Sequence, residues 1–360
     1  MPDQYYSSTA PTFKVDGTAK GELARDLLRL DVEEDTEGLK TLQAHFVAIG
    51  PSSQGNDEQL LYLDGSVLDF GKSVEVTIGP PNNRKDIFKG TISALELSVE
   101  EGQMPHVTAF AEDDLMKLRM TRRMKTYENK TDAGIAQAIG SEHGLSANAA
   151  ADGPSYDVVQ QWNQSDLAFL RDRARLVQAE IWFADGAINF KTRANRSGNA
   201  VTLVNGNHLV AVQLRADLAH QRTKVKVSGY DAKQRAQIED EAGTAAIQAE
   251  VSGGRLGPTL LQQALGDRIN HRLSETPLVV AEATSWAKAE MLERSRKFVT
   301  VTGTTRGTPE LAVGSTLTLE RVGAPYNGGG YYTTSVRHSY DLNTGHRTHF
   351  TAERANLNQP

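Results

Sequence analysis

The sequence predicts an α+β protein that is mainly β. Alternating apolar and polar residues, typical of strands, fill the first third of the chain and its C-terminal part. Helical periodicity is confined to the stretches between these two regions. A strand pattern from the first region recurs in the last. We therefore expect one small β-module to occur twice, with helices between and inside the copies.

Five segments of the first third have the period-2 alternation of strands, and Gly, Pro and Asn turns separate them. In Ser73–Ile78, the apolar residues Val74, Val76 and Ile78 share one face and polar residues occupy the other. This pattern is typical of an antiparallel sheet with one solvated side. The five segments are LLRLDVEED, LKTLQAHFVAIG, SVEVTIGP, DIFKGTISALELSVE and HVTAFAED.

Two helices are predicted after Asp114. In KTDAGIAQAIGSEHGL, Thr131 or Asp132 is a suitable N-cap, and Gly144 stands where a glycine would end the helix. The second helix lies in NQSDLAFLRDRARLVQ, whose apolar residues recur on one face and whose charged residues occupy the other.

Strands return after the second helix. AEIWFADGAINFKT predicts a hairpin that turns at Asp185–Gly186, and KVKVSGY predicts another strand. From about Ala232 to Arg296 the chain has a polar, helical composition with loops at SGGRLGP and SETP. Lys297 to Arg354 again predicts strands and turns, so the helical block interrupts a β-domain.

An internal repeat links the two β-regions. LDFGKSVEVTIG (Leu68–Gly79) is similar to LAVGSTLTLERVG (Leu311–Gly323). At nearly the same distance downstream, FKGTISALEL has the pattern of YYTTSVRHSY, and each unit ends on a strand that closes with Ala-Glu. Two unrelated alternating strands bounded by glycine can look alike, but three matches in one order favour duplication of a β-module.

Composition excludes several classes of function. The 360-residue chain is long enough for two or three domains. Its net charge of −6 argues against a general nucleic-acid binder, and its lack of cysteine excludes disulfides, thiolate metal sites and thiol nucleophiles. No apolar run approaches the about 18–20 residues of a membrane span. The opening segment, MPDQYYSSTAPTF, lacks the features of a secretory signal, so we expect assembly in the cytoplasm.

The strongest candidate for a metal or catalytic site is GGGYYTTSVRHSYDLNTGHRTHFTAER, which holds three of the nine histidines. The pattern predicts a hairpin in which His338 lies across from His346 or His349. Zinc needs a further protein ligand, and nothing nearby supplies one. We therefore interpret these histidines as packing on a half-buried barrel wall, and we interpret Gly328–Gly330 as a turn because a phosphate cradle would open a helix.

Other polar clusters have no catalytic spacing. The carboxylate runs Glu33, Glu34, Asp35 and Glu112, Asp113, Asp114 stand at strand ends, where we expect solvated edges rather than facing acids. The basic run KLRMTRRMK (Lys117–Lys125), with Arg122, Arg123 and Lys125, is either a solvated connector or a contact for an acidic partner. We predict no catalytic, cofactor-binding or metal residue, and no cofactor.

Four segments carry a resemblance to a known family, in the family's order and from about Phe13 to Arg354. They resemble the hub proteins of contractile tails: the phage late control protein D family and the hub region of the type VI secretion VgrG spike proteins. One departure is that the helix at Leu167–Gln178 runs into Ala179–Glu180, where the family often turns on a glycine. The four segments are LDFGKSVEVTIG…DIFKGTISALEL…HVTAFAEDDLMKL, RMKTYENKTDAGIAQAIGSEHGL, QQWNQSDLAFLRDRARLVQAEIWFADGAINF and GGGYYTTSVRHSYDLNTGHRTHFTAER.

The resemblance implies two antiparallel β-barrels of similar architecture, with a helical segment between them and inserted into the second. The expected parts are residues 1–115 as first barrel, 116–180 as connecting domain, 181–232 plus 297–355 as second barrel, and 233–296 as a helical insertion packing on the connecting domain.

The resemblance also implies a homotrimeric structural hub rather than an enzyme. Such a hub matches a hexameric tail tube to a separate trimeric spike and contacts baseplate wedge proteins. It becomes part of a virion or a contractile injection particle, including one released from the cell. No membrane and no specific nucleic acid is an expected partner. Two alternatives stay open: the hub of a non-contractile phage tail, and a β-rich cell-wall hydrolase.

Overall fold

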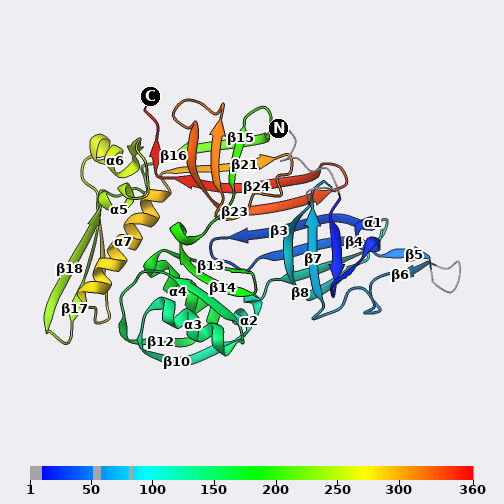
Figure 1. Cartoon of the computed structure of the whole chain (residues 1–360), viewed down its shortest axis with the longest axis horizontal. Coiled ribbons are helices and arrows are strands. Elements are labelled where there is room, and N and C mark those ends of the chain that lie inside the picture. The colour runs from blue at the N-terminus through cyan, green and yellow to red at the C-terminus, as the bar shows by residue number, and fades with distance from the viewer. Residues whose placement is uncertain (1–9, 52–57, 81–83, 360) are drawn as a thin grey trace.

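The structure is a computed structural model that describes residues 10–51, 58–80 and 84–359. Strands make up 48% of it and helices 20%, which confirms the predicted α+β, mainly β class. Figure 1 shows the sheets of the two β-regions side by side, with helical parts below them and at one end. Residues 1–9 of the opening segment, where we predict no secretory signal, lie outside the described ranges.

One large sheet forms the body of the molecule. Its main path follows the order β16-β21-β24-β23-β3-β4-β9-β8-β7-β1-β2, and β22 and β15 extend from β23. Its strands are β1 (Thr12–Val15), β2 (Thr18–Ala19), β3 (Leu27–Asp35), β4 (Thr41–Val47), β7 (Ser73–Ile78), β8 (Lys85–Ser98), β9 (His106–Glu112), β15 (Ala200–Val204), β16 (Leu209–Ala216), β21 (Val299–Thr305), β22 (Thr316–Glu320), β23 (Gly328–Asp341) and β24 (Gly345–Arg354).

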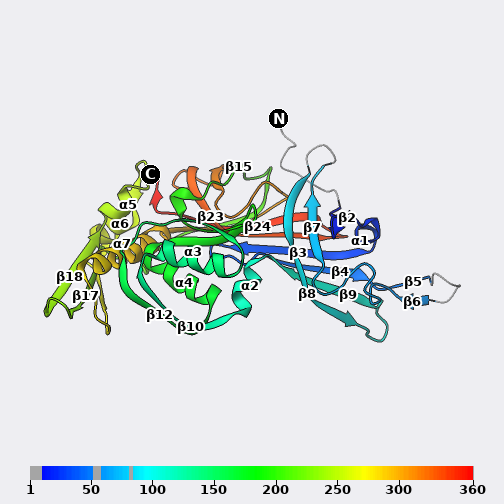
Figure 2. The same cartoon turned by 60° about the horizontal axis from the view of Figure 1, so that its bottom comes forward.

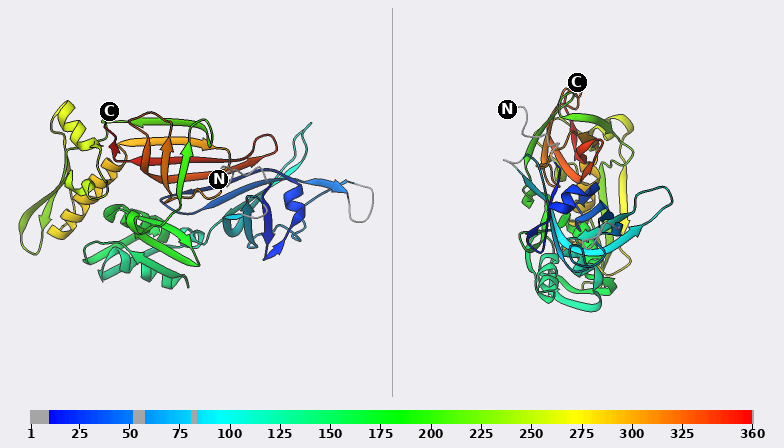
Figure 3. Two further views of the ribbon diagram at one scale, coloured as in Figure 1. Left: turned by 45° about the horizontal axis from the view of Figure 1, so that its top comes forward. Right: turned by 90° about the vertical axis from the view of Figure 1, so that its right-hand side faces the viewer.

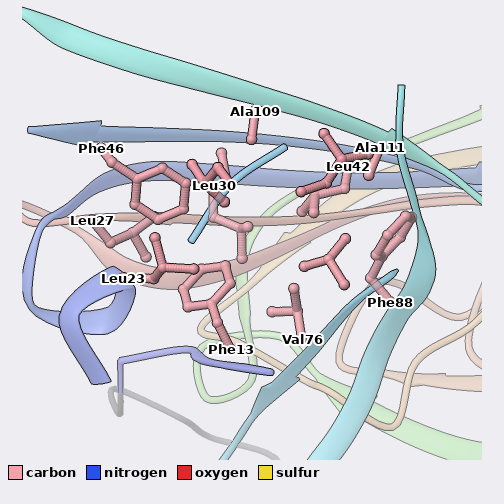
Figure 4. Close-up of a cluster of buried hydrophobic side chains, with 14 of the residues drawn as sticks. Phe13, Leu23, Leu27, Leu30, Leu42, Phe46, Val76, Phe88, Ala109 and Ala111 are labelled. Atoms are coloured by element: carbon pink, nitrogen blue, oxygen red, sulfur yellow. The ribbon is translucent and has the colours of Figure 1, made fainter. Parts of the chain in front are cut away.

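The N-terminal unit, made of β1–β4 and β7–β9, encloses its own core. Figure 4 shows Phe13, Leu30 and Phe46 pointing toward one another inside it, and the rings of Phe13 and Phe46 meet edge to face at 5.4 Å. The short helix α1 (Gly21–Arg25) contributes the buried Leu23. A hairpin of β5 (Ile49–Pro51) and β6 (Glu58–Leu60) leaves the unit at its outer end.

The C-terminal unit, made of β15, β16 and β21–β24, has a separate core. Its buried side chains include Leu203, Val301, Leu317 and Tyr331. Figure 3 shows its orange and red strands directly beside the blue strands of the N-terminal unit. The two units meet where β23 pairs antiparallel with β3, from Ser335↔Asp35 to Asp341↔Arg29.

The two units have one strand order. It is β3-β4-β9-β8-β7-β1 in the N-terminal unit and β16-β21-β24-β23-β22-β15 in the C-terminal unit. Neighbouring strands are antiparallel in both units, except that β15 lies parallel to β22 whereas β1 lies antiparallel to β7. The predicted internal repeat is therefore confirmed, and it extends over six strands.

The repeat includes the irregularities of the strands. β8 bulges between Ile92 and Ala94 against β9, and β23 bulges at the equivalent place against β24. The bulged side chain donates a hydrogen bond to the facing strand in both units: Ser93 Oγ to Phe110 O at 3.5 Å, and Thr334 Oγ1 to Thr351 O at 3.3 Å. The two donors are separated by the same number of residues along the chain as the two acceptors. Bulges are specific features of a fold, so their repetition supports duplication.

The connecting part between the units holds the two predicted helices. α3 (Asp132–Glu142) begins after Thr131, whose side chain accepts from Gly134 N, and Gly144 follows its end with φ +66°. α4 (Asp166–Val177) ends at Gln178, which adopts φ +53° without being glycine. Around them lie α2 (Leu115–Met120), β10 (Arg122–Lys130), β11 (Ser146–Ala150), β12 (Tyr156–Ser165), β13 (Ala179–Ala184), β14 (Ala187–Thr192) and the 3₁₀ turn η1 (Arg193–Asn195).

The pairing of the connecting strands differs from the expected division of the chain. β13 and β14 form the predicted hairpin, with Asp185 and Gly186 at positive φ in its turn. β14 also pairs with β11, so this hairpin belongs to the sheet of the connecting part. Most of it lies within the range expected for the second barrel, and its first two residues, Ala179 and Glu180, lie in the range expected for the connecting domain.

The segment between β16 and β21, which we call the second insertion, contains strands where the sequence predicts a helical block. That prediction is therefore wrong in part. β17 (Lys224–Asp231), β18 (Ala236–Gly243) and β20 (Ile269–Leu273) form a three-stranded sheet covered by α7 (Val280–Arg296). Figures 1 and 2 show this arm at the end of the molecule opposite β5 and β6. The insertion also holds α5 (Ala245–Gln248), β19 (Arg255–Leu256), which pairs with β25 (Asn356–Leu357), and α6 (Gly257–Leu265).

The turn between β3 and β4 ties three parts together. Thr36 N donates to Thr334 O of β23, and Ile181 N of β13 donates to Thr36 O. Gly38 in this turn has φ +73°, and a Cβ there would lie 2.5 Å from Ile181 O. The turn therefore needs glycine both for its backbone conformation and for close packing.

We expect Gly38→Ala to lower the unfolding free energy by about 2–4 kcal/mol, from left-handed strain plus overpacking. Gly17→Ala is the matched control, because Gly17 also has φ +73° but nothing lies within 4 Å of its added Cβ. The control should lose only about 1 kcal/mol. Urea unfolding of both variants measures the difference, and equal losses would contradict close packing at Gly38.

Candidate assembly site

The sequence-predicted histidines separate into two groups. His338 and His346 are buried together: Nδ1 of His338 shares hydrogen bonds with Nε2 of His346 at 3.2 Å and with Thr348 Oγ1 at 3.1 Å. Leu311 O accepts from His338 Nε2 at 3.1 Å. Burial lowers the pKa of His338 to about 3 and holds that of His346 well below its usual value. Both rings are therefore neutral at pH 7.

His349 lies on the opposite face of the sheet. Its Nδ1 shares a 3.0 Å hydrogen bond with Thr304 of β21. The equivalent pair in the N-terminal unit, His45 and Thr108, makes the same contact at 2.9 Å with the two residue types exchanged between the strands. In the described part of the chain, no group of three or more His, Asp or Glu side chains is placed to hold a metal ion.

The two carboxylate runs are not uniformly solvated edges, which corrects that expectation. Glu34 is largely buried and binds Lys40 and Arg196, whereas Glu33 stays exposed. Asp113 is buried and accepts from the backbone N–H groups of Lys40 and Leu115. Burial raises the pKa of Asp113 to about 7. The position of these carboxylates at strand ends did not indicate their burial, because the burial comes from the connecting part, which covers the strand ends.

Most cations of the basic run pair with acidic groups of the chain, whereas Arg122 bonds Asn163. Its residues belong to α2 and β10, and Arg123 Nε donates at 2.9 Å to the fully buried Asp166. Arg123 and Lys125 also pair with Glu142 of α3. His143 and Gln161 complete the hydrogen bonds of Asp166. The run therefore fixes α3 and α4 on β10, and Arg123 and Lys125 already have acidic partners.

The glycines Gly328–Gly330 begin β23 instead of forming a separate turn. Gly328 and Gly330 have positive φ, and the pairing of β22 with β23 shifts register beside them. Glycine is needed here because β23 starts with an irregular pairing.

A cluster of buried charges, which sequence reasoning missed, joins the parts of the chain. Arg196 donates to Glu34 of β3 at 2.7 Å and to Glu180 of β13 at 3.2 Å. Tyr332 OH also donates to Glu180, at 2.7 Å. We call this group, formed by Glu34, Glu180, Arg193, Arg196, Tyr332 and Glu353, the junction cluster.

Aromatic rings complete the junction cluster. The Arg196 guanidinium lies 4.4 Å from the centre of the Trp182 ring, and that of Arg193 lies 4.0 Å from the Tyr332 ring. Arg193 donates to Glu353 of β24 at 2.6 Å. Burial, followed by the charge of Glu180, raises the pKa of Tyr332. Each carboxylate here is bound to a guanidinium, so the cluster clamps the units and the connecting part together.

The polar face of the large sheet is continuous across both units. Side chains of β3, β16, β21, β23 and β24 line a groove on it, and Nε of Arg337, one of the lining residues, lies 3.0 Å from Asp31 Oδ1. The groove includes Glu33, Thr302, Thr304, Ser335, Arg337 and His349. The groove also includes the apolar Val212, Val336 and Phe350, so its lining is mixed, and it is open to solvent.

Comparisons with known proteins place the chain in a family. It matches the family model described as Alg8 N-terminal domain over residues 40–341, most of its length, and it belongs to that family. No curated protein sequence matches it. None of the helices in the described ranges combines the length and hydrophobicity that crossing a lipid bilayer needs.

Solved structures share the fold. The 43 kDa tail protein of prophage MuSo2 from Shewanella oneidensis aligns with TM-score 0.69 and 13% identity, covering 96% of this chain and 98% of that one. A tail protein from Neisseria meningitidis MC58 aligns with TM-score 0.66 and 12% identity, covering 96% of each chain. An E. coli protein described as a component of the type VI secretion system aligns with TM-score 0.57 and 13% identity, covering 93% of this chain and 76% of that one. The chain thus has the fold of phage tail proteins.

We expect Arg196→Met to lower the unfolding free energy by about 3 kcal/mol, because Glu34 and Glu180 lose a partner without regaining water. The Arg196 side chain is only 5% exposed. Arg175→Met is the control, since the Arg175 side chain is 57% exposed and its pairs with Glu37 and Asp172 should contribute about 0–1 kcal/mol. Chemical unfolding tests both, and a loss at Arg196 no larger than the control would show that the cluster is not a clamp.

The neutral histidine pair should make the protein less stable in acid. Below about pH 6.5, His338 and His346 bind protons in the unfolded state but stay neutral in the folded state. The unfolding free energy therefore decreases as the pH is lowered, by at most about 1.4 kcal/mol per pH unit for each ring. Asp113 acts with the opposite sign between about pH 4 and 7.

Comparing the parent with His338→Gln/His346→Gln cancels the contribution of Asp113, which both proteins retain. The variant should lose less stability than the parent between pH 6.5 and 4.5, as measured by urea unfolding at each pH. If the unfolding free energies of the two proteins changed equally with pH, this would contradict the expectation that the pair is protonated only in the unfolded state.

Proposed function

We propose that the chain is a structural hub of a contractile tail or injection-system baseplate, of the late control protein D and VgrG hub type. The fold shared with tail proteins supports a place in a tail. The observation that carries the proposal is the duplicated six-strand unit. Three copies of a chain with two such units present six similar modules, which suits a hexameric tube on one side and a trimeric spike on the other.

The proposed partners follow from this arrangement. They are two further copies of the chain, a tail tube protein, a separate trimeric spike and baseplate wedge proteins. We propose that the continuous polar face lines the central channel, because its Thr, Ser, Gln and charged side chains suit a water-filled lumen. The protein would be assembled in the cytoplasm and then become part of a virion or injection particle. The hub of a non-contractile tail is the related alternative.

We also propose a division of the chain that follows strand pairing. The first unit covers residues 1–115, as expected from the sequence. The connecting part extends to about residue 199, because β13 and β14 pair with β11. The second unit covers 200–216 and 299–357, and the second insertion takes the residues between, because β17 pairs with β18 and β20.

A role without catalysis is supported by how the acidic and imidazole groups are used. Glu34, Glu180 and Glu353 bind guanidinium groups, and His338 and His346 bind each other. Assaying the purified chain for hydrolysis of cell-wall material tests the enzyme alternative. Turnover that a single carboxylate substitution abolishes would contradict the proposal.

Images of the isolated assembly should show a three-fold ring whose inner rim has six similar features. Light scattering should give the mass of three chains, alone or after addition of the spike protein. A particle that remains monomeric with the spike present, or one with two-fold symmetry, would overturn the proposed hub.

A further inference from the structure

Several edges of the large sheet lack a strand partner in the described part of the chain, and two of them can be compared with the joint between the units. One is the second half of β8, from Ala94 onward, on the side away from β9. There, β7 pairs with β8 only as far as Thr91. The other is the outer edge of β16, whose opposite edge pairs with β21. Unpaired N–H and C=O groups on such edges are templates for another strand.

The internal repeat identifies what these edges are equivalent to. The second half of β8 corresponds to the second half of β23, and β16 corresponds to β3. Within the chain, these two equivalents are paired with each other: β23 joins β3 from Ser335↔Asp35 to Asp341↔Arg29. Each free edge therefore matches one partner of a joint that the molecule already contains.

We propose that the second half of β8 in one copy pairs antiparallel with β16 of a second copy, in the register of the β23–β3 joint. That register places Glu96 opposite Arg215, Leu97 opposite Leu214, and Val99 opposite Val212. The proposal deepens the hub function above and rests on it for closure into a ring. Because the contact is head to tail, it gives a closed ring of three copies only if neighbouring copies are related by a rotation of a third of a turn.

Apolar side chains on β8 support this occupant. Leu97 of β8 and Val99, the residue directly after β8, are 39% and 63% exposed, although they continue the alternation that places Leu95 on the core-facing side. In the in-chain joint, the equivalent of Val99 is Tyr340, which packs against the core of the N-terminal unit. The residues offered by β16 on the same side are Val212 and Leu214, which are only partly buried at the rim of the C-terminal core. Pairing would cover all four.

The charges at the proposed contact are complementary, and their signs are exchanged between the strands relative to the β23–β3 joint. In the in-chain joint, Arg337 of β23 stands opposite Glu33 of β3, with Nε and Oε1 3.8 Å apart. At the equivalent positions β8 carries Glu96 and β16 carries Arg215. Arg215 now binds its neighbour Asp217, but its side chain is 71% exposed and has donors to spare. Either order of the two charges favours this register over one shifted by a residue.

Cysteine cross-linking tests the register, and the chain has no native cysteine to interfere. Directly opposed antiparallel residues have Cα atoms about 4.5–5.5 Å apart, within the range of a disulfide. Purified Glu96→Cys/Arg215→Cys should form disulfides between copies after oxidation, seen as dimer and trimer bands on a non-reducing denaturing gel. Reduction should return them to monomer. Glu33→Cys/Arg337→Cys, at the in-chain joint, should cross-link within the chain and keep monomer mass.

The off-register control is Glu96→Cys/Gln213→Cys, which should cross-link at least ten times less. Equal cross-linking of both pairs, or none in a sample that light scattering shows to be trimeric, overturns the pairing and leaves the hub function standing. Bands that continue beyond the trimer support the pairing and contradict the closed ring. A chain that stays monomeric and uncross-linked at its highest soluble concentration, with or without spike protein, overturns both.

Discussion

The antiparallel pairing of β3 with β23 is the contact on which the rest of the structure depends. It joins two units with distinct hydrophobic cores into one sheet and sets the distance between them. Beside it lies the junction cluster, where buried guanidinium and carboxylate groups from β3, β13, η1 and β24 meet. Buried ion pairs contribute little net stability but strongly penalise any arrangement that separates the partners. The cluster therefore specifies how the parts are arranged more than how stable they are.

The turn between β3 and β4 adds a second constraint at the same place. Thr36 bonds β23 on one side and β13 on the other, and Gly38 brings the backbone against Ile181. Displacement of the connecting part would break both contacts and separate the buried Arg196 from Glu34 of β3. The connecting part thus moves with the joint between the units, and we expect the whole chain to enter an assembly as one body.

Local patterns in the sequence predicted the elements of the sheet and the two helices of the connecting part well. Alternation and turn residues are local, and one-sided burial makes them regular in β3, β4 and β7. The prediction for the second insertion failed because β18, AQIEDEAG, is rich in good helix formers. Only its pairing with β17 makes it a strand. The junction cluster could not be predicted, since Glu34, Glu180 and Glu353 are far apart in sequence and no spacing relates them.

In the proposed hub, the duplication would let one chain contact neighbours of different symmetry. The two units agree where they form the sheet, down to the bulges of β8 and β23. They differ in the connection between the first two equivalent strands: residues 36–40 join β3 to β4, whereas residues 217–298 join β16 to β21. Insertion into a turn leaves the strand order intact, because the strands before and after still pair as in the other unit. In the proposed ring of three chains, the sheet would keep six nearly equal modules, whereas the connecting part, the β5–β6 hairpin and the arm would occur three times each. The departure from six-fold symmetry would therefore lie in these parts.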